Sequence, residues 1–186
     1  PMFLQAVASA AFAYAVMSFL MTATPINMYV IENYSLNKTG IVIQLHIVSM
    51  FLPSLITGNL LSKFGHSKII YAGVSFYILT ILLSFLQPSF FNYLFSLIFL
   101  GIGWNFLYLS GTGLLILSYR EEEKFKAQGF NDILVFSIQA LASLSAGYML
   151  SLTSWKTMNL ITIPFLFLII FSSIRADLSK ENKLKS

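Results

Sequence analysis

The sequence has few charged residues and no cysteine. Only 10% of its 186 residues are charged, whereas 57% are hydrophobic, and the mean hydropathy is +0.79. A soluble domain of this size leaves much of its surface in water, and so few charged side chains could not cover that surface. This composition excludes a soluble enzyme, a disordered chain and a nucleic-acid-binding domain. The absence of cysteine excludes a disulfide framework and a thiolate site.

Several chemical motifs are also absent from the sequence. It has no His/Cys cluster with metal-ligand spacing, no Walker-type phosphate loop and no G-x-S-x-G motif. We therefore expect neither a cofactor nor a metal ion. Transport driven by ATP would need another subunit.

Long uncharged runs are the main feature of the sequence. A helix needs about 20 apolar residues to cross a bilayer, and strands of a membrane barrel are shorter and alternate in polarity. The runs predict an all-α integral membrane protein whose residues 1–174 form one six-helix bundle, followed by a polar cytoplasmic tail at 175–186 that frays. The predicted spans are residues 3–24, 40–61, 69–86, 90–118, 131–150 and 157–174.

Proline and glycine mark irregular points in these spans. Pro25 is placed in the exit from the first span, Pro53 interrupts the second, and Pro164 lies inside the sixth. The fourth span contains several glycines, so we expect it to tilt or bend.

Basic residues predict the orientation of the spans. Nine of the 11 Lys and Arg lie in the second and fourth connections and in the tail. The positive-inside rule places those segments, and therefore both termini, on the cytoplasmic side. We expect a multi-pass protein of the inner, or plasma, membrane that contacts the lipid bilayer and binds no nucleic acid.

The turn between the second and third spans carries the most specific pattern, GNLLSKFGHSK at residues 58–68. It resembles the loop signature of the major facilitator superfamily, G-x-x-x-D-R-x-G-R-R, at Gly58, Lys63 and Gly65. Ser62 replaces the acidic residue of the signature, and Lys68 supplies a basic residue one position late. The segments MTATP (21–25), MFLPS (50–54), GWNF (103–106) and QGFND (128–132) resemble a poorly characterised bacterial branch of this superfamily.

This resemblance implies a fold and a partner. Six spans with a degenerate loop signature after the second resemble helices seven to twelve of a twelve-helix transporter. Because the first residue is Pro1, we expect a fragment whose N-terminal half is missing. The implied partner is that six-helix half or a second chain, and the implied substrate is a small molecule bound between two bundles.

Polar residues inside spans are candidates for function because burying them in lipid is unfavourable. His46 could bind solute or carry protons, or it could be a neutral side chain bonded to a neighbouring helix. Gln44 is two positions away and faces another direction, so we expect only one of the two to reach a central cavity.

An aromatic pair beside an amide lies in the fourth span. Trp104 and Tyr108 are one turn apart and could stack on a flat organic solute, with Asn105 supplying hydrogen bonds. The alternative is helix packing, with Asn105 joining two helices. The 18 phenylalanines are assigned to lipid-facing or core surface.

The fifth span carries the one acidic residue predicted within a span. Asp132 is a candidate for coupling or gating, together with Gln128 and Asn131, and Gln139 is a candidate for the cavity. Asp132 could instead be a structural carboxylate at the helix start. Thr22 and Thr24 could line an outer vestibule or bond carbonyls released by Pro25.

These residues favour secondary active transport of a small organic solute by alternating access, coupled to an ion or to protons. One alternative is a non-transporting membrane assembly or sensor protein with the same bundle. Another is an integral-membrane enzyme that uses His46 and Asp132 as acid and base, which we do not favour.

Overall fold

The computed structural model describes residues 1–185, and the side chains of residues 1–182. Within this part of the chain, helices are joined by short turns and there is no strand. Six helical segments are long and apolar enough to cross a membrane, which confirms the predicted all-α membrane fold. The elements, in chain order, are α1 (Met2–Pro25), the π-helix η1 (Ile26–Ile31), α2 (Leu36–Phe51), α3 (Ser54–Phe64), α4 (His66–Leu83), α5 (Phe90–Ile116), the 3-10 helix η2 (Glu121–Glu123), α6 (Lys124–Leu152), α7 (Trp155–Ile161) and α8 (Ile163–Lys185).

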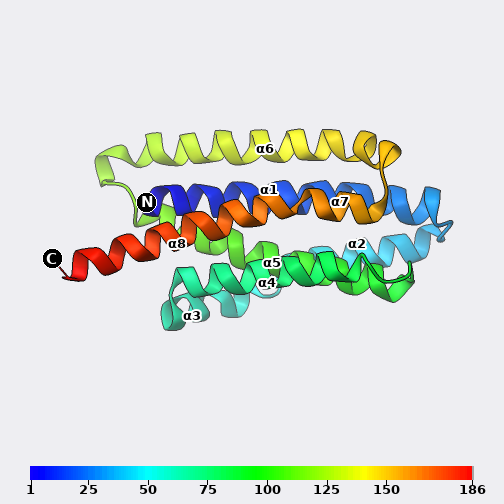
Figure 1. Cartoon of the computed structure of the whole chain (residues 1–186), viewed down its shortest axis with the longest axis horizontal. Helices are drawn as coiled ribbons and strands as arrows, with labels where there is room; N and C mark the ends of the chain where they lie inside the picture. The colour runs from blue at the N-terminus through cyan, green and yellow to red at the C-terminus, as the bar shows by residue number, and fades with distance from the viewer. Residues whose placement is uncertain (186) are drawn as a thin grey trace.

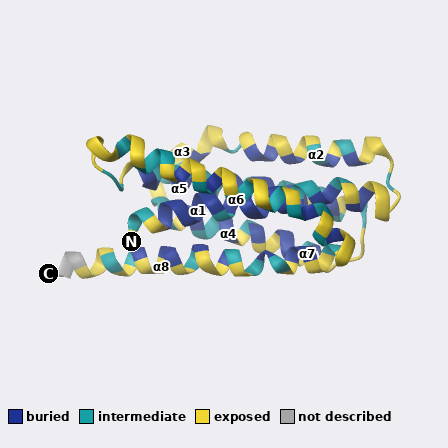
Figure 2. Cartoon of the chain, turned by 90° about the horizontal axis from the view of Figure 1, so that it is seen from above, coloured by how far each residue is buried: buried dark blue, intermediate teal, exposed yellow. Residues whose placement is uncertain are grey.

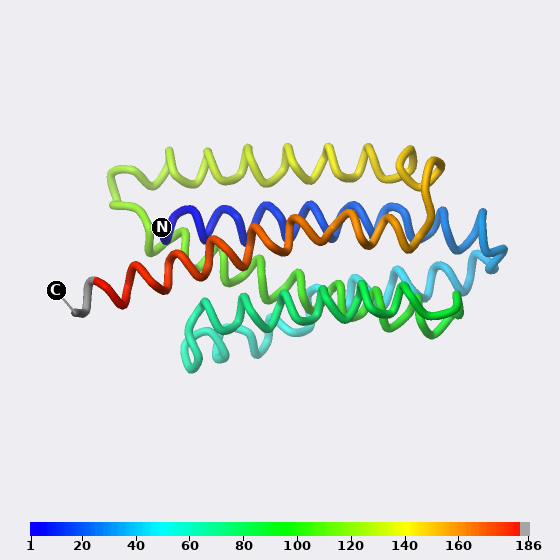
Figure 3. The backbone as a smooth tube through the Cα atoms, viewed as in Figure 1, coloured from blue at the N-terminus to red at the C-terminus, as the bar shows by residue number. Residues whose placement is uncertain are grey.

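Helices α1 and α5 form the centre of the bundle. They pack against each other, α6 packs on α1, and α2 packs on α5. Helix α4 also packs on α5, while α8 packs on both α1 and α4 (Figure 1). Buried residues are concentrated on α1 and α5, and the outer sides of α2 and α6 are exposed (Figure 2). The helices α2 and α6 therefore flank the α1–α5 pair, and α4 and α8 cover the pair on the side that faces the viewer in Figure 1. Both termini lie at the same end of the bundle (Figure 3).

The glycines of α5 allow the central helices to approach closely. A Cβ atom at Gly111 would lie 2.8 Å from the Ala6 carbonyl oxygen and 2.9 Å from the Ala10 amide nitrogen of α1. A Cβ atom at Gly101 would lie 2.8 Å from the His46 carbonyl oxygen of α2. Helix α5 runs unbroken through these positions, so the glycines serve close packing rather than a break in the helix.

The first span extends further than the sequence predicts. Pro25 is expected in the exit from a span that ends at residue 24, but the chain continues as a π-helix as far as Ile31. Proline lacks an N–H group, so regular hydrogen bonding ends there and a wider turn follows. The Glu32 amide closes that turn on the Asn27 carbonyl oxygen at 2.9 Å.

Asn105 joins α5 to the break at Pro53. Its Nδ2 donates to the Met50 carbonyl oxygen at 2.8 Å and to Ser54 Oγ at 2.6 Å. Its Oδ1 accepts a hydrogen bond of 2.7 Å from Thr57 Oγ1. Because a helix interrupted in lipid needs new partners for its backbone, Asn105 stabilises the junction between α2 and α3.

The predicted polar tail is helical. Helix α8 continues through the segment from residue 175 to Lys185, and residue 186 lies outside the described residues. Asp177 attaches this part of α8 to α4, because its carboxylate accepts hydrogen bonds from Ser67 Oγ at 2.7 Å and from the Tyr71 hydroxyl at 3.1 Å. Ser67 Oγ in turn accepts from Gln5 Nε2 of α1 at 3.0 Å. The described part of the tail thus continues α8, and the contacts that hold it at Asp177 are invisible in the sequence.

Replacing Gly111 by alanine tests the close approach of α1 and α5. The added methyl group meets backbone atoms that cannot rotate away, so we expect Gly111→Ala to lower the free energy of unfolding by about 1–3 kcal/mol. Gly147→Ala is the control, because its Cβ would meet only Ile26 Cδ1 at 3.5 Å. Denaturant unfolding of the full-length protein in detergent measures both, and equal stability of the two variants would contradict this packing.

Replacing Asn105 by alanine tests the junction at Pro53. Interhelical hydrogen bonds in membranes contribute roughly 0.6 kcal/mol each, so losing three lowers the unfolding free energy by about 2 kcal/mol. Asn92→Ala is the control, since within the described residues the Asn92 side chain bonds the exposed Gln87 carbonyl oxygen of the adjoining turn and no other helix. If Asn105→Ala were as stable as the control, Asn105 would not stabilise the junction between α2 and α3.

Candidate solute-binding surface

Five aromatic side chains from four helices meet in the middle of the bundle. Trp104 and Tyr108 of α5 stack with their ring centroids 5.1 Å apart and their planes 11° from parallel. Tyr14 of α1 contacts both edge-on, at 5.1 and 5.0 Å. Phe51 of α2 contacts Trp104 at 5.9 Å, and Phe136 of α6 contacts Tyr14 at 6.0 Å. We call these five residues the aromatic cluster.

The aromatic cluster lies at a surface. Phe51 and Phe136 are 59% and 51% exposed, while Trp104 is only 4% exposed. Because Phe51 is on α2 and Phe136 is on α6, the cluster occupies the side on which these two helices flank α1 and α5. The stacked pair is therefore the floor of a shallow aromatic surface, and the two phenylalanines form its edges.

Trp104 carries an unsatisfied polar atom in this surface. Its indole Nε1 is buried without a hydrogen-bond partner within the described part of the chain. A buried indole N–H normally finds an acceptor. The Nε1–H group therefore lacks an acceptor, and because it is buried it can meet a carbonyl oxygen or ring nitrogen of a solute only when the cluster opens.

Polar side chains flank the cluster on both sides. Gln44 is exposed on α2, two turns before Phe51 on the same side of the helix. Asp132 is exposed on α6, one turn before Phe136, and the half-buried Gln139 follows. We call the aromatic cluster together with Gln44, Asp132 and Gln139 the open face.

His46 does not belong to the open face. It is fully buried, and its Nδ1 lies 2.7 Å from the Leu97 carbonyl oxygen of α5, which fixes Nδ1 as the donor. Its Nε2 is buried without a partner among the described residues. His46 therefore joins α2 to α5, whereas Asp132 is on α6 at the other flank of the central pair.

The remaining cavity candidates bond neighbouring helices or their own backbone. Thr22 Oγ1 lies 3.0 Å from Ser143 Oγ and links α1 to α6. Thr24 Oγ1 donates to the Leu20 carbonyl oxygen of its own helix at 2.7 Å and is fully buried. Asn105 is directed to the Pro53 junction, away from the stacked pair.

The two amides placed with Asp132 make local contacts. Gln128 Nε2 donates to the Tyr119 hydroxyl at 2.8 Å. Asn131 is buried, and its Nδ2 donates to Asp132 Oδ1 at 3.2 Å. Gln128 therefore joins α6 to the turn before it, and Asn131 directly contacts the carboxylate of the open face.

The residues of the loop signature form the turn between α3 and α4. Gly65 has φ +82°, a conformation that favours glycine, and it ends α3. Gly58, Lys63 and Lys68 are exposed, and Lys63 Nζ lies 5.2 Å from the Phe64 ring centroid. Only Gly65 has a geometric need for glycine in this turn.

Sequence reasoning missed three members of the aromatic cluster, namely Tyr14, Phe51 and Phe136. Both phenylalanines were assigned to lipid or core surface together with the rest of their kind. One signal was available for Phe136, because it lies one turn after Asp132. No comparable polar marker stands near Tyr14 in its alanine-rich helix.

Comparison with known proteins places the chain in a family. The sequence profile of the Major Facilitator Superfamily matches residues 6–185. The riboflavin transporter RfnT of Brucella anthropi is 38% identical over 173 residues, which are 91% of this chain and 42% of that protein. No solved structure matches the chain.

Two proteins of Bacillus subtilis are also similar. The uncharacterized transporters YddS and YdeG of this superfamily are 33% and 32% identical, over 80% and 78% of this chain and 34% of each relative. The chain thus spans less than half the length of the curated relatives it matches. All three are named as transporters and not as enzymes. With six apolar membrane-spanning helices and a family match along almost its entire length, the chain belongs to the Major Facilitator Superfamily.

Proposed function

We propose that the chain forms half of a secondary transporter in the cell membrane that moves a planar heteroaromatic solute of the flavin class by alternating access. The aromatic cluster carries this proposal. Its stacked floor suits a flat solute, and the Trp104 N–H, which is buried without an acceptor, suits the carbonyl groups of a flavin ring once the cluster opens to admit it. The 38% identical riboflavin transporter supports the same solute class.

A second six-helix bundle completes the pathway in this proposal. Gly40, Gly58 and Gly129 lie in α2, α3 and α6, and a Cβ atom at any of them would meet nothing within 4 Å. Glycine inside a helix costs about 0.5–1 kcal/mol relative to alanine, so it is favoured where another helix comes close. The second bundle covers the open face and is either a further segment of the same polypeptide or another chain.

Coupling to protons fits the place of Asp132. Its carboxylate is exposed on the open face, one turn from the aromatic cluster, and its Oδ1 accepts from Asn131. Binding a proton there changes the charge beside the solute, which allows solute and proton binding to influence each other. The fully buried His46 takes part only if α2 and α5 separate enough to admit water.

A non-transporting sensor or assembly protein is the alternative function. It would bind the same solute on the same surface without moving it. Counterflow of labelled riboflavin through vesicles containing the full-length protein separates the two, because only a carrier exchanges solute across the membrane.

Tyr108 tests the solute site. Tyr108→Leu removes the ring that stacks on Trp104, so we expect the Kd for riboflavin to rise about fivefold, equivalent to about 1 kcal/mol of aromatic contact. Quenching of riboflavin fluorescence by the full-length protein measures this affinity. Phe106→Leu is the matched control, because Phe106 is two positions away and contacts Phe76 of α4 at 5.8 Å. Equal affinity in wild type and both variants, or no binding at all, would refute the flavin site.

Asp132 tests the coupling. We expect Asp132→Asn to abolish riboflavin accumulation driven by a pH gradient while counterflow exchange continues, because the neutral amide cannot bind a proton. Glu122→Gln, which neutralises an exposed acid in η2, is the control and should accumulate normally. His46→Gln examines the second candidate, and normal accumulation in both the Asp132 and the His46 variants would exclude proton coupling through either residue.

A further inference from the structure

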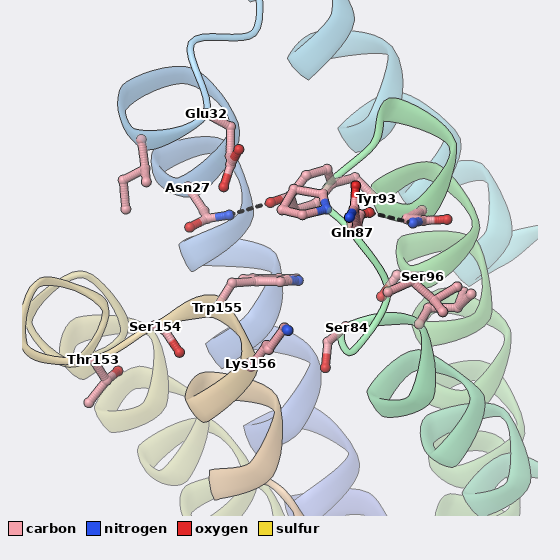
Figure 4. Close-up of a pocket in the computed structure, with 15 residues that line it drawn as sticks. Asn27, Glu32, Ser84, Gln87, Tyr93, Ser96, Thr153, Ser154, Trp155 and Lys156 are labelled. Atoms are coloured by element: carbon pink, nitrogen blue, oxygen red, sulfur yellow. Dashed lines mark hydrogen bonds between the residues drawn. The ribbon is translucent and has the colours of Figure 1, made fainter.

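A polar pocket lies at the end of the bundle opposite the termini. Its volume is about 270 Å³, and it is walled by the end of the first span, the α4–α5 turn and the start of α7 (Figure 4). Pockets for drug-sized molecules are about 300–1,000 Å³, so this one suits a smaller group. Tyr93 and Trp155 form aromatic walls, with ring centroids 5.6 Å apart.

The pocket presents one charge of each sign. Glu32 and Lys156 both line it, and within residues 1–182 neither forms an ion pair. In Figure 4 the Trp155 side chain lies between them. The Asn27 Nδ2 donates to the Tyr93 hydroxyl at 2.5 Å and holds that aromatic wall in place. Separated opposite charges beside aromatic faces complement a ligand that has an ammonium and an anionic group.

An apolar groove lies near this pocket on the outside of the bundle. It has a volume of about 330 Å³ and runs between α4 and α7–α8, lined by Ile81, Leu82, Phe85, Leu160, Ile163 and Ile170 among others. The two sites use neighbouring positions of the same helix end, because Ser84 lines the pocket and lies between Leu82 and Phe85 of the groove in the sequence. Lys156 of the pocket is likewise one helical turn from Leu160.

The length of the groove matches one leaflet of a bilayer. From Leu160 to Ile170 a helix rises roughly 15 Å, and the hydrocarbon core is about 30 Å thick. Tyr34, Tyr93 and Trp155 lie at the pocket end, where aromatic side chains commonly mark the membrane interface. A charged pocket at the interface above an apolar groove of leaflet depth has the form of a whole phospholipid.

We infer that the pocket and groove bind one aminophospholipid. The primary ammonium of the headgroup pairs with Glu32 beside Tyr93 and Trp155, the phosphate pairs with Lys156, and an acyl chain lies in the groove between α4 and α8. This site is separate from the open face, so it does not depend on flavin transport.

Native mass spectrometry of the full-length protein tests this site. The probes are phosphatidylethanolamine and phosphatidylglycerol with identical acyl chains, and water-soluble glycerophosphoethanolamine. We expect wild type to prefer phosphatidylethanolamine. Glu32→Gln should lower the affinity for that lipid about tenfold and leave the affinity for phosphatidylglycerol unchanged, because a charge-assisted hydrogen bond is lost. Lys156→Gln should lower the affinity for both lipids, whereas Lys63→Gln, at the opposite end of the bundle, should change neither affinity.

The acyl chain is tested separately. Ile163→Trp fills the groove and should lower the affinity for both lipids while leaving the polar pocket intact. Equal affinity of wild type for the two lipids, or an unchanged preference in Glu32→Gln, would overturn the headgroup assignment. If glycerophosphoethanolamine bound as tightly as phosphatidylethanolamine, the assignment of a whole lipid would be wrong and a soluble zwitterionic ligand would be indicated.

Discussion

The close contact between α1 and α5 determines the arrangement of the other helices. Small residues let the two backbones meet at Gly111, and the Ser9 hydroxyl donates to the Leu107 carbonyl oxygen at 2.8 Å. The same contact brings Tyr14 of α1 against the stacked pair on α5. A wider separation of these helices would divide the aromatic cluster. The packing of the core and the proposed solute surface thus depend on one helix pair.

Polar side chains in the spans fall into two groups according to what they contact. His46 and Asn105 bond backbone atoms of a neighbouring helix and hold the bundle together. Asp132 and Gln44 are exposed on the flanking helices, beside the aromatic cluster. In lipid an exposed carboxylate or amide is unfavourable, so this second group indicates a face directed at protein or water. Location relative to the central pair, and not residue type, separates structural from candidate functional residues.

The sequence predicts the number of spans well because the length of each apolar run is a local property. It does not predict which side of a span faces which neighbour. Asn105 and Tyr108 are equal candidates in the sequence, and only the packing of α5 turns the first toward Pro53 and the second toward Tyr14. Phe51 could not be distinguished from lipid-facing phenylalanines for the same reason, and the only sequence signal for Phe136 is Asp132 one turn before it. The helical tail was missed because Asp177 is stabilised by partners more than 100 residues away.

The most direct measurement asks whether the open face meets water or lipid. The chain has no cysteine, so single cysteines at Phe136 and, as a control, at Phe167 in the α4–α8 groove can be labelled selectively once any cysteine elsewhere in the protein is replaced. The account predicts that a charged, membrane-impermeant maleimide labels Phe136→Cys and spares Phe167→Cys, and that riboflavin protects the first from labelling. An unreactive cysteine at 136, or one that riboflavin leaves unprotected, would contradict a solute pathway over the aromatic cluster.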